Sequence, residues 1–272
     1  HPNVIPVFDA GEQDGRLYVA MRLVSGEDLG AVLRREGPLE PERAARIIAQ
    51  VGDALDAAHE TGLVHRDVKP ANILLERRAG AEHVYLTDFG ITKGGGGPAG
   101  LTRTGDWVGT VDYVAPEQIE GRDVDRRTDV YALGAVLFHT VTGEAPYAHD
   151  SEVAKIYAHL SKPIPTVMES LEGAPPELDG TIQRAMAKDP AQRYATAGEL
   201  GREAVIAVGG EGELSPETRK LAAEAAAAAK ARQAEERAAR EREERERAER
   251  EARERAEREA REREERERRE RE

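Results

Sequence analysis

The last 42 residues of the chain contain almost nothing that could form a hydrophobic core. Residues 231–272 hold 16 Arg, 17 Glu and eight Ala, and Ala is their only apolar residue type. A segment of this composition cannot bury enough apolar surface to fold into a globular domain. A globular fold must therefore come from the first 230 residues, which are enough for one large domain.

A glycine-rich stretch separates the two parts. Gly209, Gly210 and Gly212 end the last apolar periodicity, and Ser215-Pro216-Glu217 follows. Ser is a preferred helix cap, and Pro suits the first helical position. We therefore predict a domain over residues 1–207, a linker over 208–214 and a charged helix over 215–272.

The spacing of charges in this segment favours a helix in water. Glu precedes Arg by four residues repeatedly, as in Glu243 and Arg247, and each such pair stabilises a helix by about 0.2–0.5 kcal/mol. Ala recurs every four residues between 248 and 260, unlike the alternating spacing of a coiled-coil seam. A single solvated helix is favoured, and a weak coiled coil and a disordered linker stay open.

Composition excludes several classes of function. The chain has 40 Lys and Arg against 53 Asp and Glu, a net charge of −13, and no Cys. Residues 231–272 are nearly neutral, so the acidity belongs to the globular part and argues against a nucleic-acid partner. The absence of Cys excludes disulfide scaffolds, thiolate zinc sites and cysteine nucleophiles.

The globular part begins with strand-like runs and continues with helices. Residues 4–8 and 17–21 flank a turn-rich segment, which predicts a hairpin. Apolar spacing predicts a long helix over 41–60. Short strands are then expected over 73–75 and 84–86, and helices over 128–141, 153–160, 177–187 and 195–205. This order predicts an α+β fold with few strands and a mainly helical body.

Three short motifs occur in order along this part. They are His65-Arg66-Asp67-Val68-Lys69-Pro70-Ala71-Asn72, Asp88-Phe89-Gly90 and Ala115-Pro116-Glu117. Each motif alone is weak, because an Asp after a strand is usually a turn former. In the joint motif set, Asp67, Asn72 and Asp88 are separated by 5 and 16 residues. Their joint occurrence in this order strongly indicates a catalytic function.

The three motifs resemble those of protein kinases, and more narrowly those of the eukaryotic-like (Hanks-type) Ser/Thr kinases of bacteria. Lys69, two residues after Asp67, is the Ser/Thr-type form of the loop. The resemblance covers about residues 1–207. It implies a protein-kinase-like α+β fold, with truncated N-lobe strands before a helical C-lobe, and transfer of the ATP γ-phosphate to Ser or Thr of protein substrates.

The resemblance also implies roles for single residues of the loop. Asp67 would orient the substrate hydroxyl and accept its proton, and Lys69 would place a cation near the transferred phosphate. Asn72 and Asp88 would bind Mg²⁺, with Mn²⁺ as an alternative, because hard oxygen donors suit these ions.

Three apolar residues are expected around the adenine of ATP. Met21 matches the gatekeeper of the family, Val24 belongs to the hinge segment, and Leu74 matches the apolar floor under the ring. Lys69, Asn72 and Asp88 complete the expected ATP site.

Other matched residues would support the site or regulate it. Thr102 and Thr104 resemble an autophosphorylated pair, and Thr110 matches the residue that bonds Asp67. A homodimer that phosphorylates in trans is a further expectation. The structural residues implied by the resemblance are His65 packing under Phe89, Arg66 facing a loop phosphate, Glu117 paired with Arg193, and Asp129 anchoring a central helix.

Two parts of the family pattern do not occur in the sequence, namely a G-x-G-x-x-G-x-V stretch and a strand Lys paired with a helix Glu. We therefore expect this chain to be inactive by itself and to derive from a longer kinase. The kinase domain is expected in the cytoplasm, with an anchor outside this chain in the parent protein. A pseudokinase scaffold, a small-molecule phosphotransferase and a coiled-coil adaptor remain as alternatives.

Overall fold

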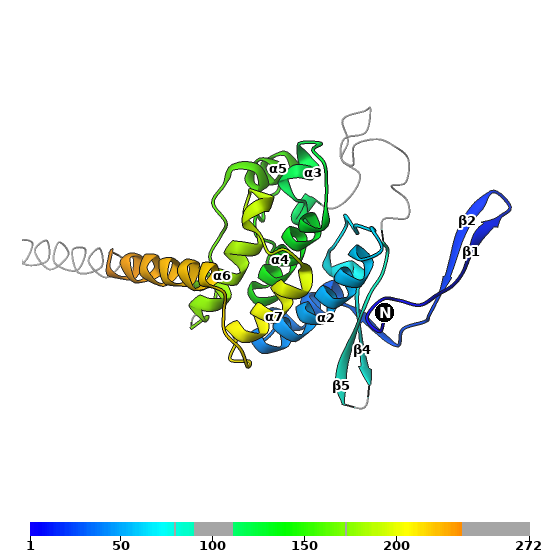
Figure 1. The fold of residues 1–272 in the computed structure, drawn as a ribbon, viewed down its shortest axis with the longest axis horizontal. Helices are drawn as coiled ribbons and strands as arrows, with labels where there is room; N and C mark the ends of the chain where they lie inside the picture. The colour runs from blue at the N-terminus through cyan, green and yellow to red at the C-terminus, as the bar shows by residue number, and fades with distance from the viewer. Residues whose placement is uncertain (79, 90–110, 172, 236–272) are drawn as a thin grey trace, which may run out of the picture. The chain divides into compact units, whose positions relative to one another are not determined.

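The structure, a computed structural model, describes residues 1–78, 80–89, 111–171 and 173–235. It forms two compact units, His1–Ala225 and Ala226–Glu272. The first unit has two small sheets and a helical body (Figure 1). In the second unit, the described residues 226–235 are helical. Within the described ranges, no helix combines the length and apolarity needed to cross a bilayer.

The predicted hairpin is confirmed, but its strands differ in extent. Strands β1 (Val7–Gln13) and β2 (Arg16–Met21) form an antiparallel two-stranded sheet. Asp14 and Gly15 join them with φ of 52° and 74°, as a two-residue turn with two positive φ values requires. This tight turn lets the strands continue through the segment that the sequence suggested was loop.

A second sheet brings the ends of two motifs together. Strands β3 (Gly26–Asp28), β4 (Ile73–Arg78) and β5 (Ala81–Leu86) are antiparallel and lie in that order. The short helix η1 (Pro70–Asn72) leads directly into β4, and Asp88 follows β5 by two residues. Because β4 begins opposite the end of β5, the first and second motifs meet at one end of this sheet.

The helical body is built around one buried helix. Helix α4 (Arg126–Thr142) has buried side chains on all its faces, and it lies among α2, α6 and α7 (Figure 1). The remaining helices are α1 (Leu29–Glu36), α2 (Pro41–His59), α3 (Pro116–Ile119), α5 (Glu152–Ser161), α6 (Pro176–Ala185) and α7 (Ala197–Ala207). The five longer helices predicted from the sequence are present, and α6 ends two residues earlier than expected.

Glycines allow α2 and α7 to cross at backbone distance. A Cβ atom placed on Gly52 would lie 2.5 Å from the carbonyl oxygen of Ala197, and one on Gly201 would lie 2.6 Å from the Cα of Ala49. At the same crossing, the carboxylate of Asp56 accepts the backbone N–H groups of Ala197 and Gly198 at 2.9 and 3.0 Å. The crossing therefore also caps the N-terminus of α7.

We predict that Gly52→Ala lowers the free energy of unfolding by about 1–3 kcal/mol, because a backbone oxygen of α7 leaves no room for the added methyl group. Urea unfolding measures this change. Gly30→Ala in α1 is the control, since only the side-chain ends of Asp28 and Arg34 lie within 3.4 Å of a Cβ at that position. Equal stability of Gly52→Ala and the wild type would contradict the close crossing.

Candidate active site

The first motif forms a compact polar loop around Asp67. The Lys69 Nζ lies 2.9 Å from the Asp67 Oδ2. The Asn72 amide donates to the backbone carbonyl of Asp67 at 2.8 Å and lies 3.4 Å from its Oδ2. Asp67 and Lys69 are half-buried, whereas Asn72 is buried. The loop thus holds one carboxylate at the surface with a cation and an amide beside it.

The carboxylate of Asp129 fixes the backbone of this loop from below. Its Oδ2 accepts the backbone N–H of His65 and its Oδ1 accepts the backbone N–H of Arg66, both at 2.8 Å. His59 Nε2 lies 2.7 Å from the Asp129 Oδ2. Asp129 is fully buried in α4. These hydrogen bonds therefore replace those that its carboxylate would make with water if it were exposed.

Two residues at the site have a strained backbone. Arg66 and Asp88 have φ of 65° and 59°, a left-handed region that residues with a side chain seldom adopt. Besides the hairpin residue Asp14, no other non-glycine residue in the described ranges has a positive φ. Such strain persists only where surrounding contacts enforce it, and it gathers at functional sites.

His65 joins the first motif to the second. Its Nε2 lies 2.9 Å from the Thr87 carbonyl oxygen, its Nδ1 lies 3.3 Å from the Asp67 backbone nitrogen, and its ring lies 4.8 Å from that of Phe89. The neutral tautomer with hydrogen on Nε2 satisfies both ring nitrogens. His65 is fully buried, so it ties the loop to the residue before Asp88.

Asp88 offers a free carboxylate next to this loop. Its residue is exposed, and the described residues give it no ion pair or hydrogen bond. The side-chain amide of Asn72 donates its N–H group to Asp67, which leaves the side-chain oxygen Oδ1 available. Carboxylate and amide oxygens fit Mg²⁺, which is commonly held by one or two carboxylates together with phosphate oxygens and water. The residues present therefore fit the ion.

The residues expected around adenine lie on the strand side of the loop. The Met21 sulfur, at the end of β2, lies 3.8 Å from the Thr87 hydroxyl. Leu74 lies in β4 and is paired with Asp28 of β3. Val24 and Leu74 are half-buried, whereas Met21 is 38% exposed. Met21 thus lies next to Thr87, the residue before Asp88. Leu74 lies in β4, the strand that begins directly after Asn72.

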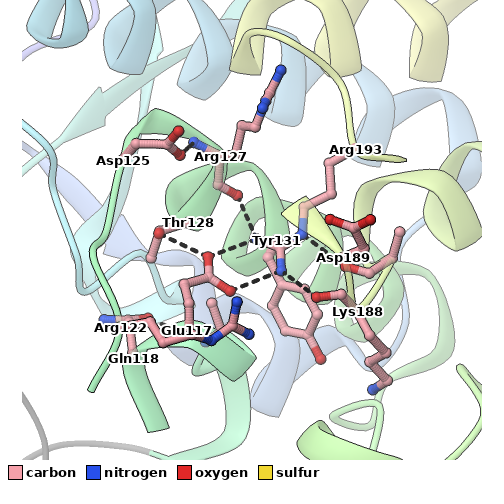
Figure 2. A network of polar contacts seen from close by, with 12 residues as sticks. Glu117, Gln118, Arg122, Asp125, Arg127, Thr128, Tyr131, Lys188, Asp189 and Arg193 are labelled. Atoms are coloured by element: carbon pink, nitrogen blue, oxygen red, sulfur yellow. Dashed lines mark hydrogen bonds and ion pairs between the residues drawn. The ribbon is translucent and has the colours of Figure 1, made fainter. Parts of the chain in front are cut away.

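A buried ion pair holds the third motif to the helical body (Figure 2). Arg193 donates to both carboxylate oxygens of Glu117, at 2.7 and 2.8 Å, and Thr128 of α4 donates to Oε1 at 2.8 Å. Burial raises the pKa of Glu117, but the hydrogen bonds and charge of Arg193 outweigh it and hold the pKa below its ordinary value. Arg193 also donates to the backbone carbonyls of Ala187, Arg127 and Lys188.

Two residues that complete these contacts were not predicted from the sequence. Gln118 donates to the Arg66 carbonyl at 3.0 Å and accepts the Ala115 N–H at 3.1 Å, so it joins the third motif to the first. The signal in the sequence that could have pointed to Gln118 is its position directly after the third motif, next to Glu117. His59 contacts Asp129, but nothing in the sequence around it predicts this contact, apart from its place at the end of a helix.

Three residues with expected roles lie outside the described ranges. They are Thr102, Thr104 and Thr110.

A family model described as "Protein kinase domain" matches residues 1–204. The chain belongs to the protein kinase family. Its relatives place this kinase domain within the Hanks-type Ser/Thr kinases of bacteria.

Curated relatives include Ser/Thr-protein kinases of mycobacteria. PknD of Mycobacterium tuberculosis is 46% identical over 200 residues, which cover 73% of this chain and 30% of the relative. PknH of Mycobacterium bovis is 47% identical over 199 residues, covering 73% and 33%. The kinase domain described here thus spans about a third of the length of these relatives.

Solved structures show the same fold. The kinase domain of Mycobacterium tuberculosis PknI matches with a TM-score of 0.59 and 33% sequence identity, covering 76% of this chain and 73% of that chain. Its C20A mutant matches with a TM-score of 0.60 and 31% identity, covering 77% and 73%. The fold class predicted from the sequence is confirmed.

We predict that Arg193→Ala lowers the free energy of unfolding of the kinase domain by about 3–5 kcal/mol, because it leaves Glu117 charged and buried without its partner. Thermal or urea unfolding checks this value. Arg35→Ala is the matched control, since the pair of Arg35 with Glu27 is exposed and exposed pairs contribute only about 0.2–1 kcal/mol. Similar losses in both variants would contradict the role given to the buried pair.

Proposed function

We propose that this chain carries the catalytic loop of a Ser/Thr protein kinase that transfers the γ-phosphate of ATP to protein hydroxyls. The observation that carries the proposal is the half-buried carboxylate of Asp67, paired with Lys69 and Asn72 on a loop that Asp129 anchors. In this family, phosphoryl transfer depends mainly on positioning and on charge stabilisation.

Asp67 is proposed to orient the acceptor hydroxyl and accept its proton. The hydroxyl oxygen then forms a bond to the γ-phosphorus, the bond between that phosphorus and the leaving oxygen breaks, and ADP departs. Lys69, at 2.9 Å from this carboxylate, supplies a positive charge where the transferred phosphoryl group carries negative charge.

ATP and Mg²⁺, for which Mn²⁺ is the alternative, are the proposed cofactors. Asn72 and Asp88 are the proposed ligands of the ion, and Met21, Val24 and Leu74 are proposed to contact the adenine. A bound divalent ion would neutralise the charge that the phosphates share. ATP is made and used in the cytoplasm, so the proposal places the kinase domain there.

Regulation is proposed to act through Thr102 and Thr104. A phosphate on either residue adds a charge of about −1.5 to −2, and exposed Arg66 is its proposed partner. Thr110 is proposed to bond Asp67 and so to belong to the catalytic machinery. Phosphorylation in trans would require two copies of the kinase.

We predict that Asp67→Asn in the full-length kinase lowers the rate of phosphate transfer by several orders of magnitude and leaves ATP binding nearly unchanged. The amide keeps the shape of the side chain but cannot accept the proton. Transfer of radiolabelled phosphate to a protein substrate measures the rate, and calorimetry measures ATP affinity. Mass spectrometry of the same samples should find phosphate on Thr102 or Thr104 only in the wild type.

Asp53→Asn, on an exposed position of α2, is the matched control and should keep the wild-type rate. Wild-type turnover in Asp67→Asn would refute the role of Asp67. Loss of ATP binding together with turnover would instead assign Asp67 to the nucleotide site.

A further inference from the structure

The helix that follows the kinase motifs begins inside the first compact unit. It starts at Pro216, and the Ser215 Oγ lies 3.3 Å from the backbone nitrogen of Thr218, as at a helix N-cap. Thr218 is fully buried and Ala222 is 5% exposed, whereas neighbouring Lys220 is 76% exposed. One face of the first turns is therefore buried, although the sequence suggested a solvated helix.

This face packs closely against the backbone of α6. A Cβ atom placed on Gly180 would lie 2.7 Å from the Thr218 carbonyl oxygen and 2.7 Å from the Ala222 nitrogen. Real Cβ contacts are essentially never that short, so a larger residue at position 180 would push the helix away. The two backbones thus meet at a place where only glycine fits.

A buried carboxylate from α7 binds the start of the helix. Glu203 accepts the backbone N–H of Ser215 at 3.0 Å through Oε1, and through Oε2 it accepts the hydroxyls of Thr218 and, at 3.1 Å, Tyr194. Glu203 is 7% exposed. Burial raises the pKa of Tyr194, so its hydroxyl stays a donor to this cluster.

Arg184 of α6 closes the same cluster. Its Nη1 donates to the Ser215 hydroxyl at 2.7 Å and lies 3.6 Å from the Glu203 carboxylate. Its guanidinium group stacks 4.1 Å from the centre of the Tyr194 ring. We call Arg184, Tyr194, Glu203, Ser215 and Thr218 the brace cluster.

The brace cluster adjoins the contacts that hold the catalytic loop. Tyr194 follows Arg193 directly in the chain, and Arg193 makes the buried pair with Glu117. Gln118, next to Glu117, donates to the carbonyl of Arg66 in the loop. A continuous series of contacts and chain neighbours therefore leads from the helix that starts at Pro216 to the loop that carries Asp67.

We propose that residues 215–222 act as a brace that holds Tyr194 and thereby positions Arg193 against Glu117. The helix that starts at Pro216 is then a working part of the kinase domain, and a change that pulls on this helix weakens the support of the loop that carries Asp67. Thr218 and Glu203 are positioning residues in this arrangement.

Hydrogen–deuterium exchange of the whole chain tests the brace. Thr218→Val keeps the size of the side chain but removes the donor to Glu203. Because a hydrogen bond to a charged group is strong, we expect exchange over 215–222 to rise by about tenfold or more. The same rise is expected at two distant amides, those of Arg122 and Arg193, which bond to the carbonyls of Glu117 and Pro190.

Two control variants separate the brace from simple damage. Thr218→Ser keeps the hydroxyl and should restore protection at both distant amides. Lys220→Ala changes an exposed residue of the same helix and should exchange like the wild type. A rise confined to 215–222 in Thr218→Val, with Arg122 and Arg193 still protected, would overturn the proposal.

Gly180→Ala provides a second perturbation from the α6 side and should raise exchange at the same distant amides. If Thr218→Val does not fold, exchange of the wild type in low urea decides the question. Opening of residues 215–222 together with Arg122 and Arg193 supports the brace. Opening of 215–222 alone, at lower urea than the other two, overturns it.

Discussion

The carboxylate of Asp129 is the contact on which the loop that carries Asp67 depends. It accepts two successive backbone N–H groups, from His65 and Arg66, and a ring nitrogen of His59 lies within bonding distance. A buried charge left without partners would be unfavourable by several kcal/mol. The backbone N–H groups of the loop provide these partners. The same two hydrogen bonds hold the backbone of Arg66 in its left-handed conformation.

The position of Asp129 explains why this contact is rigid. Helix α4 is buried continuously from Thr128 to Phe138, so Asp129 cannot shift without disturbing the core. Thr128, the preceding residue, donates to Glu117. The same turn therefore holds the loop with Asp67 and the segment with Glu117, which are linked again by Gln118. Two motifs far apart in sequence thus share one support.

Much of this arrangement could be predicted from the sequence. The long helix over 41–60 follows from apolar spacing, the short strands over 73–75 and 84–86 and the helix over 128–141 were expected from their residues, and the family follows from the three motifs. Helix α1 was missed because it is only eight residues long and contains Gly30, although Asp28 in front of it is a recognisable N-cap.

The tertiary contacts could not be predicted, because they depend on which surfaces meet. Thr218 and Ala222 look like ordinary surface residues in a charged helix, and only the fit against Gly180 shows that they are buried. His59 and Gln118 likewise gain their roles only when distant segments come together. A residue that acts through one long-range hydrogen bond leaves no periodic signal in a single sequence.

Amide exchange of His65 and Arg66 in Asp129→Asn tests most directly whether one buried carboxylate holds the loop that carries Asp67. The substitution keeps the size of the side chain but replaces one acceptor oxygen with a donor. The account predicts that exchange at one or both amides rises by about tenfold or more, while the Thr87 amide, which bonds to the Asn72 carbonyl, stays protected. Unchanged protection of both His65 and Arg66 would contradict it.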